Sequence, residues 1–149
     1  MTLEGNKPEE SQLFDSQFRS ITDYRKNEVI FQEGARGREM FVIYSGEVRI
    51  SKKEPDGSEI TLSTLKPGEF FGEMTLIDQS PRSATATALT DDTRLIVLDR
   101  ARFMYLLRYE PEFALIVMET LCERIREKNE QYAHLLEKVK PDNGGKQDT

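Results

Sequence analysis

The sequence of residues 70–88 reads FFGEMTLIDQSPRSATATA. It places one carboxylate, Glu73, and one guanidinium, Arg82, nine residues apart around a short predicted helix. A carboxylate accepts hydrogen bonds from vicinal hydroxyls, and a guanidinium holds a phosphate through two parallel N–H bonds. The two groups together therefore suit a ligand that carries both a phosphate and vicinal hydroxyls.

The residues around these two groups predict a small anion pocket. Gly72 lets the backbone approach a ligand without a Cβ in the way, and the helical turn near Glu73 has unpaired N–H groups that favour an anion. Pro81 predicts an extended entry into a strand. Small side chains alternate along that strand, at Ala84, Ala86 and Ala88, and leave room for a flat ligand. The alternative is a plain ion pair between Glu73 and Arg82 that holds a loop, and the residue types alone do not separate the two.

The rest of the middle of the chain predicts β structure. Strand-like runs cover residues 29–31, 40–44, 48–51, 60–65, 84–89 and 95–98. Glycines at turn positions follow each other at intervals of 11 or 12 residues: Gly34, Gly46, Gly57 and Gly68. This spacing is typical of short antiparallel strands. We predict a mostly β fold with flanking helices, in which an antiparallel β-roll (a double-stranded β-helix resembling a jelly roll) covers about residues 25–98.

Helices are predicted on both sides of the β-roll. A short helical pattern covers residues 13–24, and two helices are expected in about residues 99–140, one capped by Asp99 and one starting at Pro111. The second carries a seven-residue repeat, Met118, Leu121, Ile125, Lys128, Tyr132, Leu135 and Val139. Such a stripe packs on the β-roll or pairs with the same helix of a second chain, and we expect a parallel homodimer. The alternative is an amphipathic helix that folds back or frays.

Composition limits the class of protein. The chain has 149 residues and a formal net charge of −6, with basic residues interleaved among acids, so we expect no direct nucleic-acid partner. The single cysteine, Cys122, favours a reducing compartment. The start shows no secretion signal and no apolar run could span a membrane, which predicts a cytoplasmic protein. We interpret residues 13–140 as one domain between a disordered tail, residues 1–12, and a polar tail, residues 141–149.

Nine residues of the opening stretch form one ordered motif: Phe71, Gly72, Glu73, Leu76, Pro81, Arg82, Ser83, Ala84 and Thr85. This motif resembles the phosphate-binding cassette of the cyclic-nucleotide-binding domain family, whose members have a Crp/Fnr-like β-roll. Gly34 and Gly46 match turns of that roll, and the resemblance covers roughly residues 28–135. It is specific because a long ordered motif is joined to the right flanking turns and helices.

The resemblance implies a role for each residue of the cassette. Glu73 would accept a hydrogen bond from the ribose 2′-hydroxyl, Arg82 would pair with the cyclic phosphate, and backbone groups of Gly72, Ser83 and Ala84 would complete the cradle. Weaker candidates for ligand contact are Phe71, Met74, Thr85, Lys128 and Asn129.

The resemblance also bears on the base. A hydroxyl directly after the arginine, here Ser83, accompanies cyclic GMP recognition in some relatives, but serine also occurs in bacterial relatives that bind cyclic AMP. We expect cyclic AMP in preference to cyclic GMP. Lys128 and Asn129 correspond most nearly to positions that approach the adenine in the catabolite-activator branch, and a solvated helix face is the alternative for Asn129.

Other functions have less support in the sequence. A metal enzyme needs clustered ligands, whereas the chain has a single histidine, His134, and a single cysteine, Cys122. No pair of a nucleophile and a base is visible in the sequence either. We therefore predict no catalytic residues, no metal site and no cofactor. Because no helix-turn-helix segment follows the predicted domain, we expect a stand-alone sensor that signals to an unknown effector protein by rearrangement of the C-terminal helix. The rival interpretation is a structural or scaffolding dimer that keeps the fold without binding nucleotide.

Overall fold

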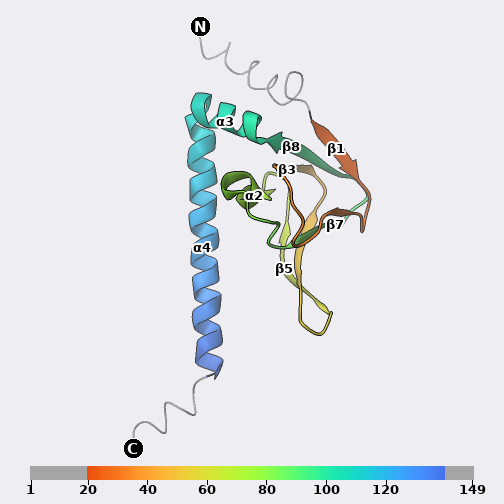
Figure 1. Cartoon of the computed structure of the whole chain (residues 1–149), viewed down its shortest axis with the longest axis vertical. Coiled ribbons are helices and arrows are strands. Elements are labelled where there is room, and N and C mark those ends of the chain that lie inside the picture. The colour runs from red at the N-terminus through yellow and green to blue at the C-terminus, as the bar shows by residue number, and fades with distance from the viewer. Residues whose placement is uncertain (1–19, 140–149) are drawn as a thin grey trace, which may run out of the picture. The chain divides into compact units, whose positions relative to one another are not determined.

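The computed structural model of the chain describes residues 20–139 (Figure 1). Its strands are β1 (Ile21–Tyr24), β2 (Val29–Phe31), β3 (Glu39–Ser45), β4 (Val48–Lys53), β5 (Glu59–Leu65), β6 (Phe70–Phe71), β7 (Thr85–Ala88) and β8 (Thr93–Asp99). Its helices are α2 (Glu73–Asp78), α3 (Arg100–Tyr109) and α4 (Pro111–Val139). The chain divides into two compact units with the boundary after Met104, and each unit is described by itself.

The strands form two four-stranded antiparallel sheets. One sheet has the order β1-β8-β3-β6 and the other has the order β2-β7-β4-β5. The prediction of a mostly β fold with flanking helices is confirmed. The four turn glycines named in the sequence all have positive φ, namely Gly34, Gly46, Gly57 and Gly68.

The core of the β-roll is built from apolar residues of its strands. Met40, Phe41 and Ile43 of β3 are almost completely buried. One cluster joins residues from both sheets: Phe41, Ile43, Val48, Leu65, Phe71, Ala86 and Leu95. Burying each large apolar side chain contributes about 1.5–3 kcal/mol to the free energy of unfolding. Ala86 belongs to this core, so the small size of that residue serves internal packing rather than an open ligand-facing surface.

The helical pattern predicted for residues 13–24 is wrong at its C-terminal end. Residues 21–24 form β1, which pairs with β8 in the register Ile21↔Ile96. The two apolar ends of this strand, Ile21 and Tyr24, are half-buried, and the two residues between them are exposed. A spacing of three residues between apolar positions is compatible with a helical turn as well as with a short edge strand. Hydrogen bonding to β8 decides between the two. Residues 13–19 of the predicted helix and both predicted tails lie outside the described residues.

A register shift bends the second sheet near one edge. The pairing of β4 with β5 slips by one residue between Ile50 and Ser51. β5 is the edge strand, and six of its seven residues are exposed. A tight turn joins the two strands, in which the Gly57 amide donates to the Glu54 carbonyl at 2.9 Å. β4 and β5 therefore form a hairpin with a bulge that increases its local twist.

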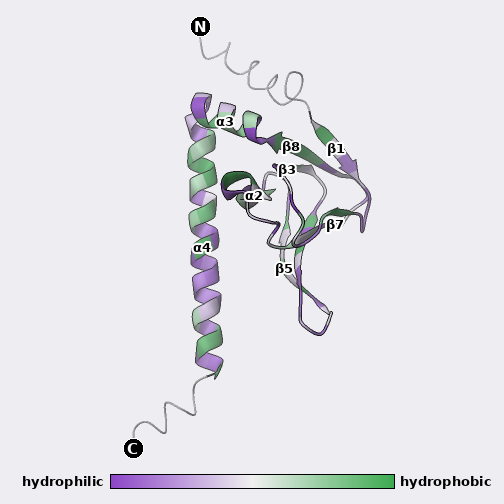
Figure 2. Cartoon of the chain, viewed as in Figure 1, coloured by the Kyte–Doolittle hydropathy of each residue, from purple (hydrophilic) through white to green (hydrophobic). Residues whose placement is uncertain are grey.

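The two C-terminal helices begin where the sequence indicated. The Arg102 amide donates to the Asp99 carboxylate at 2.8 Å, which caps α3, and Pro111 is the first residue of α4. Figure 2 shows both hydrophobic (green) and hydrophilic (purple) stretches along α4. Within residues 20–139, no helix combines the length and the apolar character needed to cross a membrane.

Helix α2 ends on a strained residue. Gln79 follows its last turn with φ at 62°, and its amide donates to the Thr75 carbonyl. An L-residue in this left-handed region costs about 1–2 kcal/mol, whereas glycine adopts it freely. We therefore expect Gln79→Gly to raise the free energy of unfolding by about 1 kcal/mol in urea titrations. The reverse exchange, Gly57→Ala at a φ of 93°, should lower it, and a loss of stability in Gln79→Gly would contradict this account.

Candidate functional site

Gly72 connects β6 to α2 at the centre of the predicted cassette. Its φ is 82°, and a Cβ at this position would lie 2.8 Å from Nη1 of Arg82 and 3.4 Å from the Glu39 carbonyl oxygen. Within this chain, the group that lies closest to Gly72 is the Arg82 guanidinium, and the approach of a ligand to this backbone stays a prediction. Glycine at this position lets the guanidinium lie directly against the backbone.

Arg82 is the most unusual side chain of the site, because it is charged and only 4% exposed. Its Nη1 donates to the Gly72 carbonyl at 3.1 Å, and its Cζ lies 4.1 Å from the centre of the Phe31 ring. Its Nε is buried and has no hydrogen-bond partner among the described residues. Burial lowers the pKa of Arg82, and the negative charges of Glu39 and Glu73 oppose that effect. Such a cation has free donors for an anion.

The loop between β2 and β3 holds Arg82 in place. The Arg82 amide donates to the Ala35 carbonyl at 2.8 Å, and the Gly34 amide donates to the Arg82 carbonyl at 2.7 Å. A Cβ on Gly37 would overlap Nη2 of Arg82 and lie 2.6 Å from its Cζ. Gly37 was not among the residues predicted for the site, and its lack of a Cβ makes room for the Arg82 guanidinium.

Glu73 lies in the first turn of α2 and is 6% exposed. The hydrogen bond of the Arg82 guanidinium goes to the Gly72 carbonyl, not to the Glu73 carboxylate. Glu73 acts on Arg82 through its charge. A plain ion pair between the two, the alternative considered from the sequence, is therefore not the arrangement seen.

The remaining candidates have different surroundings. Ala84 and Phe71 are buried, and the Phe71 ring stacks on Phe41 with centroids 5.2 Å apart. Ser83 and Met74 are exposed, and Thr85 is half-buried at the start of β7. Lys128 and Asn129 are exposed residues of α4, in the second unit. The structure thus brings together Gly72, Glu73 and Arg82, with Ser83 and Ala84 following directly along the chain.

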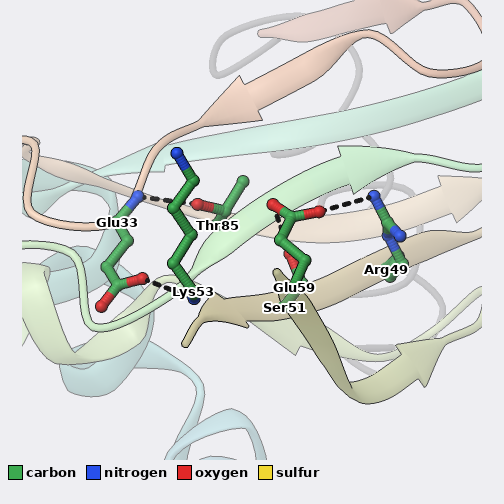
Figure 3. A network of polar contacts seen from close by, with 6 residues as sticks. All are labelled: Glu33, Arg49, Ser51, Lys53, Glu59 and Thr85. Carbon is green, nitrogen blue, oxygen red and sulfur yellow. Dashed lines mark hydrogen bonds and ion pairs between the residues drawn. The ribbon is translucent and has the colours of Figure 1, made fainter. Parts of the chain in front are cut away.

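A polar network that the sequence did not indicate supports the segment after Arg82. The Lys52 ammonium donates to the Ser83 carbonyl at 3.0 Å and pairs with the Glu33 carboxylate at 2.8 Å. The Glu33 amide in turn donates to the Thr85 hydroxyl at 2.9 Å (Figure 3). Hydrogen bonds from Lys52 and from the Lys53 amide lower the pKa of Glu33. The network connects β4 to both ends of the Ser83–Thr85 segment.

Comparisons with known proteins point in one direction. The family model described as "Cyclic nucleotide-binding domain" matches residues 21–110. The cyclic AMP receptor protein of Thermus thermophilus is 39% identical over 123 residues, which are 83% of this chain and 56% of that protein. The chain thus spans little more than half the length of that relative.

Solved structures agree with the sequence comparison. The catabolite activator protein of Thermus thermophilus superposes with a TM-score of 0.76 at 38% identity, covering 86% of this chain and 59% of that one. The cyclic-AMP-bound form of the EAL enzyme Bd1971 gives a TM-score of 0.57 at 34% identity, covering 75% and 30% of the two chains. Its cyclic-GMP-bound form gives 0.55 at 34% identity, covering 72% and 28%.

Proposed function

Since the chain belongs to the cyclic nucleotide-binding domain family, we propose that it binds a cyclic nucleotide as a regulatory sensor. The proposed site comprises Gly72, Glu73, Arg82, Ser83 and Ala84. The observation that carries the proposal is the buried guanidinium of Arg82, whose Nε lacks a partner among residues 20–139. Binding without catalysis is the proposed activity.

The geometry of Arg82 suits a phosphate in particular. Its Nη1 donates to the Gly72 carbonyl, and its Nε has no partner among residues 20–139. The edge formed by Nε and Nη2 lies beside Gly37, which has no Cβ to fill that space, and we propose that the ligand binds at this edge. Two parallel N–H groups on one edge of a guanidinium match two oxygens of a phosphate. The bond to Gly72 thus orients the cation, and the Phe31 ring below it excludes water from one face.

Cyclic AMP is the proposed ligand in preference to cyclic GMP. The curated relative from Thermus thermophilus is a cyclic AMP receptor protein, and Ser83 is compatible with either base. Calorimetric titration of the 149-residue chain with both nucleotides tests the proposal. We expect heat of binding and a raised melting temperature with cyclic AMP, and weaker binding of cyclic GMP. If neither nucleotide gave heat of binding or a thermal shift at millimolar concentration, the proposed sensor function would be wrong. The interpretation as a structural or scaffolding dimer would then be favoured.

The role proposed for Glu73 has its own test. Glu73→Gln removes the charge that would accept the ribose 2′-hydroxyl while keeping the size of the side chain. We expect this variant to bind cyclic AMP at least about tenfold more weakly, because a hydrogen bond to a charged group contributes about 1.5–3 kcal/mol. The affinity for 2′-deoxy cyclic AMP should change much less. Equal losses for the two ligands would show that Glu73 does not contact the ribose.

We also propose that α4 mediates a parallel homodimer and passes the signal to an effector protein. Apolar residues of the predicted repeat are exposed along α4: Met118, Ile125, Tyr132, Leu135 and Val139, at 56–72%. A stripe of this kind at heptad spacing favours pairing with a second helix.

The proposed dimer can be tested by sedimentation velocity. We expect a dimer at micromolar concentration for the natural chain and a monomer for Leu135→Lys, because an unpaired charge at the seam would have to be buried. Gln131→Lys adds the same charge outside the repeat and should stay dimeric. A monomeric natural chain, or identical behaviour of the two variants, would rule out pairing through this stripe.

A further inference from the structure

A cavity of about 680 Å³ lies beside α2. The five residues proposed to hold the cyclic nucleotide do not line it, but two of its lining residues, Gly37 and Glu39, also lie beside Arg82 and Gly72. Its walls come from the β2–β3 loop, from the C-terminal half of α2 and from the start of α3. All of these segments precede residue 105 and belong to one compact unit. The cavity is therefore a feature of that unit alone.

Positive charge dominates the lining of this cavity. The charged residues that line it are three arginines, Arg36, Arg38 and Arg100, and one acid, Glu39. Arg36 and Arg38 form no ion pair or side-chain hydrogen bond with another residue of the 20–139 range, and the charge of Glu39 also acts on Arg82. Because the whole chain carries a formal charge of −6, this positive region is local and does not follow from composition.

Arg100 is held in position at the cavity wall. Its Nη1 donates to the Leu76 carbonyl at 2.9 Å, near the C-terminal end of α2. One N–H donor of the Arg100 guanidinium thus holds the side chain in position, and its other N–H groups stay available for a bound anion. An arginine oriented in this way loses less side-chain entropy when it binds an anion.

Neutral hydrogen-bond donors complete the lining. Thr75 lines the cavity and is only 4% exposed. Gln79, whose positive φ costs stability, presents an amide on the same wall. A hydroxyl on this wall can donate a hydrogen bond to a bound anion.

From these contacts we infer that the cavity is a second anion site that binds a diphosphate group. Guanidinium groups bind phosphate oxygens in pairs, and three of them surround more space than one phosphate needs. The group could come from inorganic pyrophosphate or from a nucleoside diphosphate. The site uses Arg36, Arg38, Arg100 and Thr75 and is separate from the cassette arginine, Arg82.

Titration of the full chain with inorganic pyrophosphate, at an ionic strength held constant with chloride, tests this inference. We expect saturable binding, weakened at least about fivefold by Arg36→Gln and by Arg38→Gln. Arg94→Gln is the matched control, because Arg94 is exposed on β8 and pairs with Asp23 away from the cavity. It removes the same charge and should leave the affinity unchanged.

Three further measurements identify the site and the ligand. Arg82→Ala should bind pyrophosphate as the natural chain does, which separates the cavity from the cassette whether or not cyclic nucleotides bind. Competition by adenosine diphosphate would identify a nucleotide source, and its failure to compete would identify an inorganic one. The inference is overturned if pyrophosphate does not bind at millimolar concentration, if Arg94→Gln weakens it equally, or if Arg82→Ala abolishes it.

Discussion

Arg82→Ala is expected to weaken cyclic AMP binding by at least about tenfold, because a hydrogen bond to a charged group contributes about 1.5–3 kcal/mol and each 1.4 kcal/mol is tenfold in affinity. The loss should be large for this residue, since its guanidinium is 4% exposed and already oriented by the Gly72 carbonyl. Calorimetric titration of the variant measures the change.

Two comparisons make the Arg82→Ala result specific. Arg82→Lys keeps the positive charge but lacks the parallel Nε and Nη2 donors, so it should restore only part of the affinity. Arg94→Ala removes an exposed arginine on β8 and should bind as the natural chain does. If Arg82→Ala left the affinity unchanged, the phosphate would have to bind elsewhere.

Gly37→Ala is expected to weaken cyclic AMP binding by a comparable factor, although Gly37 is not one of the residues proposed to bind the ligand. The added Cβ would overlap Nη2 of Arg82 and lie 2.6 Å from Cζ, so the guanidinium must leave its place. Because the end of a long side chain can move, the free energy of unfolding should change little. Affinity from titration and stability from urea denaturation would separate the two effects.

The control for Gly37→Ala is another glycine exchange, Gly57→Ala. Gly57 has a φ of 93° in the β4–β5 turn and open space around its Cβ position. Alanine there should cost roughly 1 kcal/mol of stability and leave the affinity unchanged. In the Arg82→Ala background, Gly37→Ala should have no further effect on binding. An additional loss in the double variant would mean that Gly37 acts by another route.

The parts of the site that the sequence predicted are those built from one continuous stretch. Gly72 and the helix that begins at Glu73 depend on neighbours within ten residues or so, and local patterns report such features. The same holds for Asp99 and Pro111, whose roles at helix starts depend on the adjacent backbone.

The parts that the sequence did not predict depend on pairing between distant strands. Gly37 contacts Arg82 only because the β2–β3 loop runs beside residue 82, and no spacing in the sequence shows that approach. Lys52 reaches the Ser83 carbonyl from β4 for the same reason. Residues 21–24 were assigned to a helix because four residues cannot distinguish a helical from an extended pattern, and hydrogen bonds to β8 then decided the matter.

The bulge in the β4–β5 hairpin bears on how this chain behaves when concentrated. An edge strand presents unpaired N–H and C=O groups to any other extended chain, and β5 also exposes Ile60 and Leu62 at 45% and 42%. The slip between Ile50 and Ser51 adds twist beside that edge. The bulge shortens the flat part of β5 to which a strand of another molecule could pair. The fold therefore limits edge-to-edge aggregation along β5.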